Sequence, residues 1–174
     1  MKNSNPAGRR GFTLVEMLAV VAIIVILAAL VVGGMKYATE KTNTNKAKIQ
    51  VALLSSAIEQ YKIDTGSYPA SQNPTGENES ANLRKLLFLD GKDDTNKVKK
   101  IYLTELEETS KQGWITGTGD TAKITDPWGN EYRYRSGKAA ANQDFDVWSV
   151  GKDGKTKEDE PKAKESIDDI RNSN

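Results

Sequence analysis

Residues 11–34 read GFTLVEMLAVVAIIVILAALVVGG, and this stretch decides how the rest of the chain is arranged. Every side chain from Met17 to Val32 is apolar. As a helix rising 1.5 Å per residue, Phe12 to Val32 would span about 31 Å, which matches the roughly 30 Å hydrocarbon core of a bilayer. The run is longer than the roughly 7–15 apolar residues of a secretory signal peptide. We therefore expect a membrane-spanning helix over residues 12–34.

The charges before this helix predict its orientation. Lys2, Arg9 and Arg10 precede the apolar run, and positive residues remain on the cytoplasmic side of a membrane. The predicted topology is a short cytoplasmic leader, one membrane span and a polar domain outside, formed by residues 35–174.

Glu16 is the one acidic residue within the predicted span. A carboxylate inside a bilayer costs a few kcal/mol and usually marks a partner or a function. If the chain is cut between Gly11 and Phe12, the new α-ammonium of a neighbouring subunit could pair with Glu16 in a stack of helices. The alternative is that Glu16 lies near the headgroups and is solvated.

Composition excludes several classes of function. The formal net charge is +1 with both signs interspersed, so no basic surface for nucleic acid is predicted. The absence of cysteine and histidine excludes disulfides, thiolate metal sites and the commonest catalytic groups. A membrane-anchored periplasmic enzyme or binding domain stays open as an alternative, because paired acids for glycoside chemistry cannot be recognised from sequence. A plain single-pass tether is a further alternative.

The residues after the span predict an amphipathic helix from Met35 to Asp64. Gly66 and Pro69 are expected to end it. Polar residues, among them Gln50, fall on its other faces. Its apolar stripe is formed by residues spaced three and four apart, namely Ile49, Ala52, Leu53, Ala57 and Tyr61.

The remainder predicts a small antiparallel sheet. Residues 70–125 read as a variable insert with a short helix over 81–89, and Gly117–Ala122 as a loop. Alternating patterns over 131–135 and 145–150 predict two antiparallel strands. One sheet face is expected to pack on the helix stripe and the other to remain wetter. The predicted fold class is α+β: a long N-terminal helix, its first half transmembrane, packed on a small C-terminal antiparallel sheet.

An acidic tail follows Asp153 and Gly154. Oxygen-rich loops of this kind suit Ca²⁺, which takes six to eight oxygen ligands. Lysines dilute the charge, and the pattern is not an EF-hand loop, so from the residues alone a solvated tail is favoured over a metal site.

Several segments resemble one protein family. The sequence GFTLVEM at 11–17 is similar to the processing site of type IV pilins and type II secretion pseudopilins. QYKIDTGSYP at 60–69 resembles the end of the long helix of major pseudopilins. DPWGNEY at 126–132 and DVWSVGKDG at 146–154 resemble the signature of the major pseudopilin of the type II secretion system.

This resemblance implies specific roles for a few residues. A prepilin peptidase would cut behind Gly11 and methylate Phe12, and Glu16 would guide assembly. Residues 1–11 would be the leader, 12–34 the transmembrane and filament-core helix, and 35–174 the periplasmic domain with a pilin-like fold. A calcium ion would be held by the Val150 carbonyl, Asp153, and Asp168 or Asp169. The stretch 155–166 is longer and richer in lysine than is usual for this loop.

The implied function is that of a structural subunit, not an enzyme. It would polymerise into a periplasmic pseudopilus that drives protein export. Its implied partners are other copies of itself, minor pseudopilins, the prepilin peptidase and an inner-membrane assembly platform. A type IV pilin of a surface fibre is the close alternative, but such pilins often carry a C-terminal cysteine pair, which this chain lacks.

Overall fold

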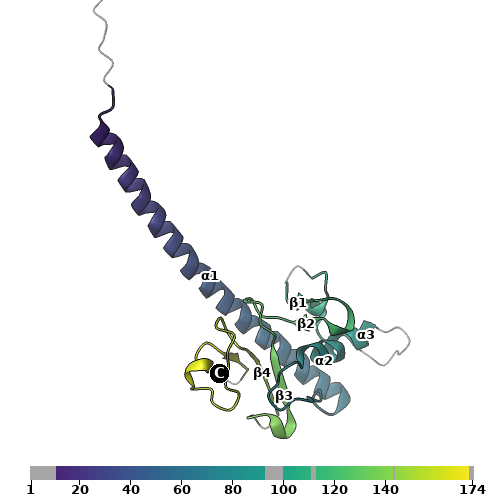
Figure 1. Ribbon diagram of the computed structural model, residues 1–174. Helices are drawn as coiled ribbons and strands as arrows, with labels where there is room; N and C mark the ends of the chain where they lie inside the picture. The colour runs from purple at the N-terminus through teal and green to yellow at the C-terminus, as the bar shows by residue number, and fades with distance from the viewer. Residues whose placement is uncertain (1–10, 93–99, 111–112, 143, 173–174) are drawn as a thin grey trace, which may run out of the picture. The chain divides into compact units, whose positions relative to one another are not determined.

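The structure is a computed structural model that describes residues 11–92, 100–110, 113–142 and 144–172 (Figure 1). It divides into two units, Met1–Lys41 and Thr42–Asn174, which are described separately below. The predicted leader, residues 1–11, lies outside the described residues except for Gly11.

Helix α1 runs from Leu14 to Thr65, so the predicted membrane helix and the predicted amphipathic helix are one continuous element. Its most apolar 18-residue window has a mean hydropathy of 3.1, and none of that window is buried within the chain. By length and composition the helix is a candidate membrane span. Gly66 ends it as predicted: with φ of +83° it adopts a left-handed conformation, and its N–H donates to the Lys62 carbonyl at 2.7 Å.

In the second unit, short elements pack along one side of the C-terminal part of α1. Helix α2 (Ser80–Arg84) continues into a π-helical turn (Lys85–Leu89) and α3 (Asp90–Lys92), in agreement with the predicted helix over 81–89. Gly117–Ala122 is a loop containing a 3-10 turn, as expected. The strands are β1 (Ile115–Thr116), β2 (Lys123–Ile124), β3 (Arg133–Ser136), β4 (Phe145–Ser149) and β5 (Ile170–Arg171).

The strands form two antiparallel sheets. Strands β1 and β2 pair alone, while β3, β4 and β5 form a sheet in that order. The two predicted strands correspond to β3 and β4, with Tyr134 opposite Val147. The first begins at Arg133 instead of 131 because Glu131 pairs across the preceding turn with Thr125. The sequence pattern did not predict β1, β2 or β5, since each has only two residues.

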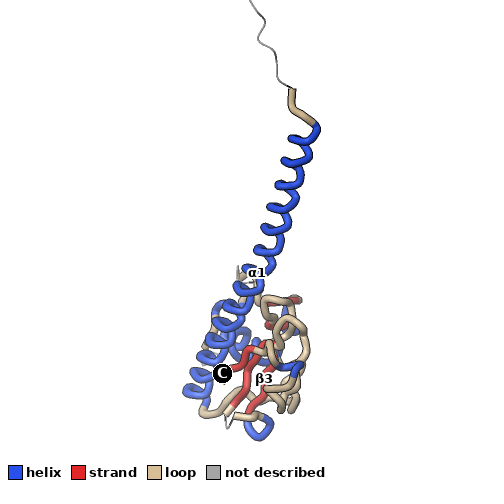
Figure 2. The backbone as a smooth tube through the Cα atoms, turned by 90° about the vertical axis from the view of Figure 1, so that its left-hand side faces the viewer, coloured by secondary structure: helices blue, strands red, loops and turns tan. Residues whose placement is uncertain are grey.

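The helix stripe faces the sheet, but rotated from its predicted phase. Ile49 is 60% exposed and Ala52 is exposed, whereas Gln50 is buried. Gln50 tolerates burial because its Oε1 accepts a hydrogen bond from the Tyr132 hydroxyl at 2.8 Å. Figure 2 shows the C-terminal part of α1 running beside the strands. The α1 residues in the apolar core are Ala47, Val51, Leu54, Ala57 and Ile58.

The second sheet face is not wet, contrary to expectation. All five residues of β4 are buried, including Asp146 and Trp148, which alternate with the core-facing Phe145 and Val147. The C-terminal tail covers this face: the Asp159 carboxylate and the Glu158 carbonyl both accept hydrogen bonds from Arg135 of β3. The tail is therefore a structural layer over this face, although the side chain of Asp159 itself stays 87% exposed to solvent.

Candidate functional site

The first candidate site is the start of α1. Gly11 and Phe12 precede the helix outside any regular element, and Phe12 is 79% exposed. A Cβ added at Gly11 would meet no atom within 4 Å. The peptide bond between the two residues therefore lies open to an enzyme, directly before the apolar helix.

Glu16 and Thr13 hold this helix end together. The Thr13 N–H donates to Glu16 Oε2 at 2.8 Å, and the Thr13 hydroxyl donates to the same oxygen at 2.9 Å. The Glu16 N–H donates in return to Thr13 Oγ1 at 3.2 Å. This reciprocal arrangement is a capping box, which satisfies donors that the first helical turn leaves without partners.

The capping box adds a role for Glu16 that neither sequence hypothesis contained. The pattern Thr13-x-x-Glu16 before an apolar run could have revealed it. The bonds use the Thr13 amide, which stays a peptide amide if the chain is cut behind Gly11. The cap therefore survives processing, and pairing with a neighbouring subunit would be additional to it.

The second candidate site is the loop between β4 and β5. Val150 is buried just after β4, and the next residue, Gly151, has φ of +68°. A Cβ at Gly151 would lie 2.5 Å from the carboxylate Oδ2 of Asp168. The Asp153 N–H donates to that same oxygen at 3.1 Å. The structure thus brings the backbone of Gly151 and Asp153 to the Asp168 carboxylate, while the Asp153 carboxylate accepts the Lys155 N–H at 2.9 Å.

Asp169 is next in sequence but faces other groups. Its Oδ2 accepts hydrogen bonds from the Thr156 hydroxyl at 2.6 Å and from Arg171 Nη2 at 2.9 Å. Its Oδ1 is buried and has no hydrogen-bond partner among the described residues. Burial raises the pKa of Asp169 above its ordinary value, while the bonds from Thr156 and Arg171 act in the opposite direction.

These residues supply some of the oxygen ligands that a hard cation such as Ca²⁺ needs. In the described part of the chain, no three acidic side chains gather into a metal site by themselves. A calcium ion at this loop would need carbonyl oxygens as well, which is ordinary for Ca²⁺. The Asp168 carboxylate, close to the backbone of Gly151 and Asp153, fits such an ion in part, and the unpartnered Oδ1 of Asp169 is a further buried acceptor.

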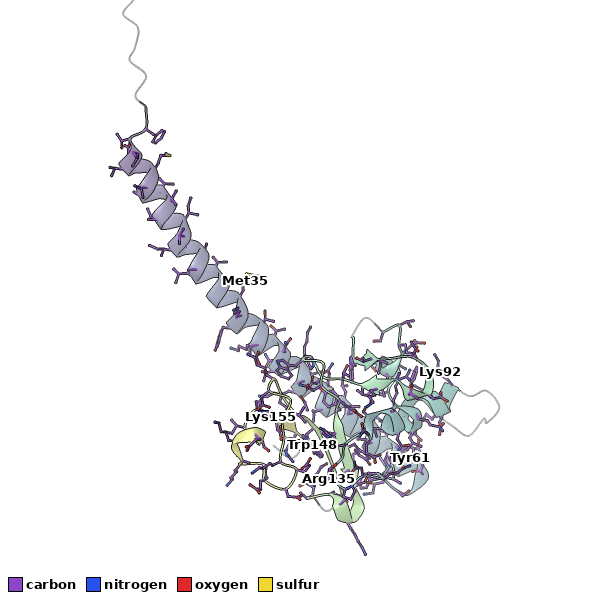
Figure 3. The ribbon with its side chains drawn as sticks, in the orientation of Figure 1. Met35, Tyr61, Lys92, Arg135, Trp148 and Lys155 are labelled. Atoms are coloured by element: carbon purple, nitrogen blue, oxygen red, sulfur yellow. The ribbon has the colours of Figure 1, made fainter. Side chains whose placement is uncertain are left out.

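Two arginines anchor the same loop. The guanidinium groups of Arg135 and Arg171 lie 5.5 and 4.9 Å from the ring centroid of Trp148, which is fully buried. Figure 3 labels Arg135 and Trp148. Both arginines donate to the Glu158 carbonyl, each at 3.2 Å. The three side chains form what we call the arginine–tryptophan clamp. Sequence reasoning missed it because nothing in the pattern places Arg135 near Arg171.

The segment DPWGN forms a structural turn beside this loop. The Asp126 carboxylate accepts the N–H groups of Trp128 and Asn130 through Oδ1, at 3.0 and 2.8 Å. Its Oδ2 accepts the Ser149 hydroxyl at 2.5 Å. Burial raises the pKa of Asp126, and these hydrogen bonds lower it. Both carboxylate oxygens of Asp126 therefore accept hydrogen bonds within the turn and from β4, so we interpret this buried acid as structural.

Comparisons with known proteins identify the family. Residues 35–77 and 96–170 match the family described as type II secretion system (T2SS), protein G, and residues 6–32 match the prokaryotic N-terminal methylation motif. Type II secretion system core protein G of Pseudomonas aeruginosa is 31% identical over 153 residues, which cover 83% of this chain and 84% of the relative. The proteins of that name from Vibrio cholerae and Escherichia coli are also 31% identical, and cover 83% and 84% of this chain and 81% and 83% of themselves. The chain belongs to the type II secretion system protein G family, whose members are structural pseudopilins and not enzymes.

Proposed function

We propose that this chain is inserted in the inner membrane through the first part of α1, cut behind Gly11, and polymerised into a periplasmic pseudopilus that drives protein export. The observation that carries the proposal is the start of α1. An accessible Gly11–Phe12 bond stands directly before a helix whose apolar side chains have no partner within the chain. Such a helix needs lipid before assembly and other helices after it.

Membership of the family makes the chain part of a type II secretion system. Its membrane topology and its specific partners are what we propose in addition. The positive residues ahead of α1 support a topology with residues 35–174 in the periplasm. A prepilin peptidase would act at Gly11, and the inner-membrane platform would add subunits to the filament. Minor pseudopilins would be further partners of the same assembly.

The N-terminal mass of the membrane-extracted chain tests the processing step. In cells with a prepilin peptidase we expect a chain that begins at methylated Phe12. In cells without the peptidase we expect an intact Met1. An intact start in both strains would contradict the proposal and would favour a membrane-anchored periplasmic domain.

We also propose that the loop between β4 and β5 binds Ca²⁺, through the Val150 carbonyl and the carboxylates of Asp153, Asp168 and Asp169. The ion would supply positive charge to a buried acid whose Oδ1 has no partner among the described residues. Arg171 supplies one cation to Asp169 already, through Oδ2. Calcium would therefore balance the negative charge of the loop carboxylates that Arg171 does not balance.

Calcium removal is expected to lower the melting temperature of the chain. Binding to the folded state alone stabilises by about 2.7 kcal/mol when the free ion is at one hundred times its dissociation constant. We expect Asp168→Asn to abolish the difference between melts in calcium and in chelator. Asp159→Asn is the matched control, because Asp159 is 87% exposed and outside the proposed ligand set. Equal melts of the unmodified chain with and without calcium would refute the site.

A further inference from the structure

Three exposed side chains follow the apolar run of α1: Lys36, Tyr37 and Lys41, which we call the interface segment. They come directly after Met35, which Figure 3 labels on the helix. The Tyr37 side chain is 74% exposed. Neither lysine makes an ion pair or a hydrogen bond with the residues that the structure describes. Two cations and an aromatic ring are therefore available to a partner outside the chain.

The charges of the chain are segregated along its length. Residues 35–58 carry four lysines and one acid, Glu40, whereas residues 59–174 carry 18 basic and 22 acidic residues. The stretch directly after the candidate span is thus basic, and the remainder of the chain is acidic. A negatively charged surface would attract the first part and repel the second.

The rise of the helix sets the distance of each lysine from the hydrocarbon. If the bilayer core ends at Val32, Lys36 lies about 6 Å and Lys41 about 13 Å beyond it along the helix axis. The headgroup zone is roughly 5–7 Å deep on each side, and unscreened charge acts across about 8 Å at physiological ionic strength. Lys36 therefore lies among the headgroups and Lys41 within one screening length of them. Lys48, about 24 Å beyond Val32, does not.

Tyr37 suits the same zone. Tyrosine is enriched at membrane interfaces, where its ring lies against apolar groups and its hydroxyl reaches water and headgroups. Tyr37 and Lys41 are four residues apart, so they share one face of α1. The long apolar stem of a lysine can also follow the lipid surface while its ammonium group stays among the headgroups.

We propose that the interface segment binds the phosphate groups of anionic lipids at the periplasmic surface of the inner membrane. Lys36 and Lys41 supply the positive charge, and Tyr37 fixes the depth of the helix. The inference rests on the proposed membrane insertion and adds a lipid class to it. These lysines do not conflict with the proposed topology, because a long domain is translocated largely regardless of its charge.

Retention of lipid by the full chain tests the proposal. The chain is reconstituted in vesicles with equal amounts of phosphatidylglycerol and phosphatidylcholine, extracted in mild detergent, and the bound lipids are counted by native mass spectrometry. We expect the unmodified chain to retain phosphatidylglycerol in preference. The leader cations Lys2, Arg9 and Arg10 are the same in every variant, so differences between variants report on α1.

Two double variants locate the binding on the helix. Lys36→Gln with Lys41→Gln is expected to lower the preference for phosphatidylglycerol by up to about 30-fold, because each basic residue near a negative membrane contributes roughly 1 kcal/mol. Lys46→Gln with Lys48→Gln is the matched control and should leave the preference unchanged. All four lysines are exposed, and glutamine has a helix propensity close to that of lysine, so α1 should stay folded.

A third variant predicts a change of the opposite sign. Glu40 lies between Lys36 and Lys41 in the sequence, and its charge opposes binding to an anionic surface. Glu40→Gln is therefore expected to raise the preference for phosphatidylglycerol several-fold. A lower or unchanged preference would contradict electrostatic binding at this segment.

The remaining outcomes separate this proposal from the proposed function. A chain that is processed and forms filaments but retains both lipids equally would overturn the lipid site alone, as would equal losses from the two double variants. If Lys36→Gln with Lys41→Gln reduces filament yield while lipid preference is unchanged, the lysines pair with acids of another subunit and the lipid site is wrong. Recovery of the unmodified chain outside the membrane would overturn both proposals.

Discussion

Glu16→Gln is expected to abolish filament assembly while the first turn of α1 stays folded. Glutamine can take the place of glutamate in a capping box, so the bonds with Thr13 can persist. It has no charge with which to pair the α-ammonium of a neighbouring Phe12. A buried ammonium without a partner is costly in an apolar helix core, and assembly should stop for that reason.

Two further variants separate the charge of Glu16 from its capping role. Glu16→Ala removes both and should fail to assemble. Thr13→Ala keeps the carboxylate, loses a cap of about 0.5–2 kcal/mol, and should still form filaments. Filament yield by electron microscopy is the measurement. If Glu16→Gln assembles and Thr13→Ala does not, assembly depends on the helix cap, and the proposed charge pairing of Glu16 is wrong.

Asp146→Ala is expected to destabilise the second unit by about 3–5 kcal/mol, the usual cost of removing one partner from a buried ion pair. The side chains of Arg135 and Asp146 are 2% and 6% exposed, and Arg135 Nε donates to Asp146 Oδ2 at 2.8 Å. Asp146 also accepts the N–H of Ala141 at 2.7 Å. Its loss would leave the buried guanidinium with only the exposed carboxylate of Asp159 to balance its charge, and would leave the Ala141 N–H without that acceptor.

Asp159→Ala is the matched control, because it removes the other carboxylate paired with Arg135. Asp159 is 87% exposed, and exposed ion pairs contribute about 0–1 kcal/mol. Thermal unfolding of the detergent-solubilised chain, followed by circular dichroism, measures both variants. Equal losses from the two substitutions would show that burial does not govern this pair.

The sequence predicted the larger elements of the fold for clear physical reasons. A continuous apolar run, a helix-ending glycine at Gly66 and two alternating strands are local patterns with strong periodicity. Which face of the amphipathic helix is buried was harder to predict. Gln50 lies on that face because its side chain accepts a hydrogen bond from Tyr132, which is 82 residues away in the sequence. A polar residue at a core position looks exposed until its distant partner is known.

The two candidate sites also differ in how far the sequence could predict them. The proposed processing residues, Gly11 and Phe12, and the proposed assembly residue, Glu16, belong to one short motif, so the sequence alone could suggest them. The loop is different, since the partners of Asp169 are Thr156 and Arg171, and the clamp joins Arg135 of β3 to Arg171 of β5 around Trp148. These contacts depend on how the tail folds back over the sheet, which no local spacing specifies.

Strand β5 sets the order in which the second unit can be completed. It follows every other strand, yet it supplies Arg171 to the clamp and covers one edge of β4. During synthesis the earlier segments leave the ribosome first, so α1 emerges long before β5 exists. A chain that stops short of Ile170 keeps its candidate membrane helix but leaves one edge of β4 unpaired, which favours aggregation and proteolysis. Only a subunit synthesised through β5 can therefore pair this edge of β4, whereas a prematurely terminated chain leaves the edge exposed.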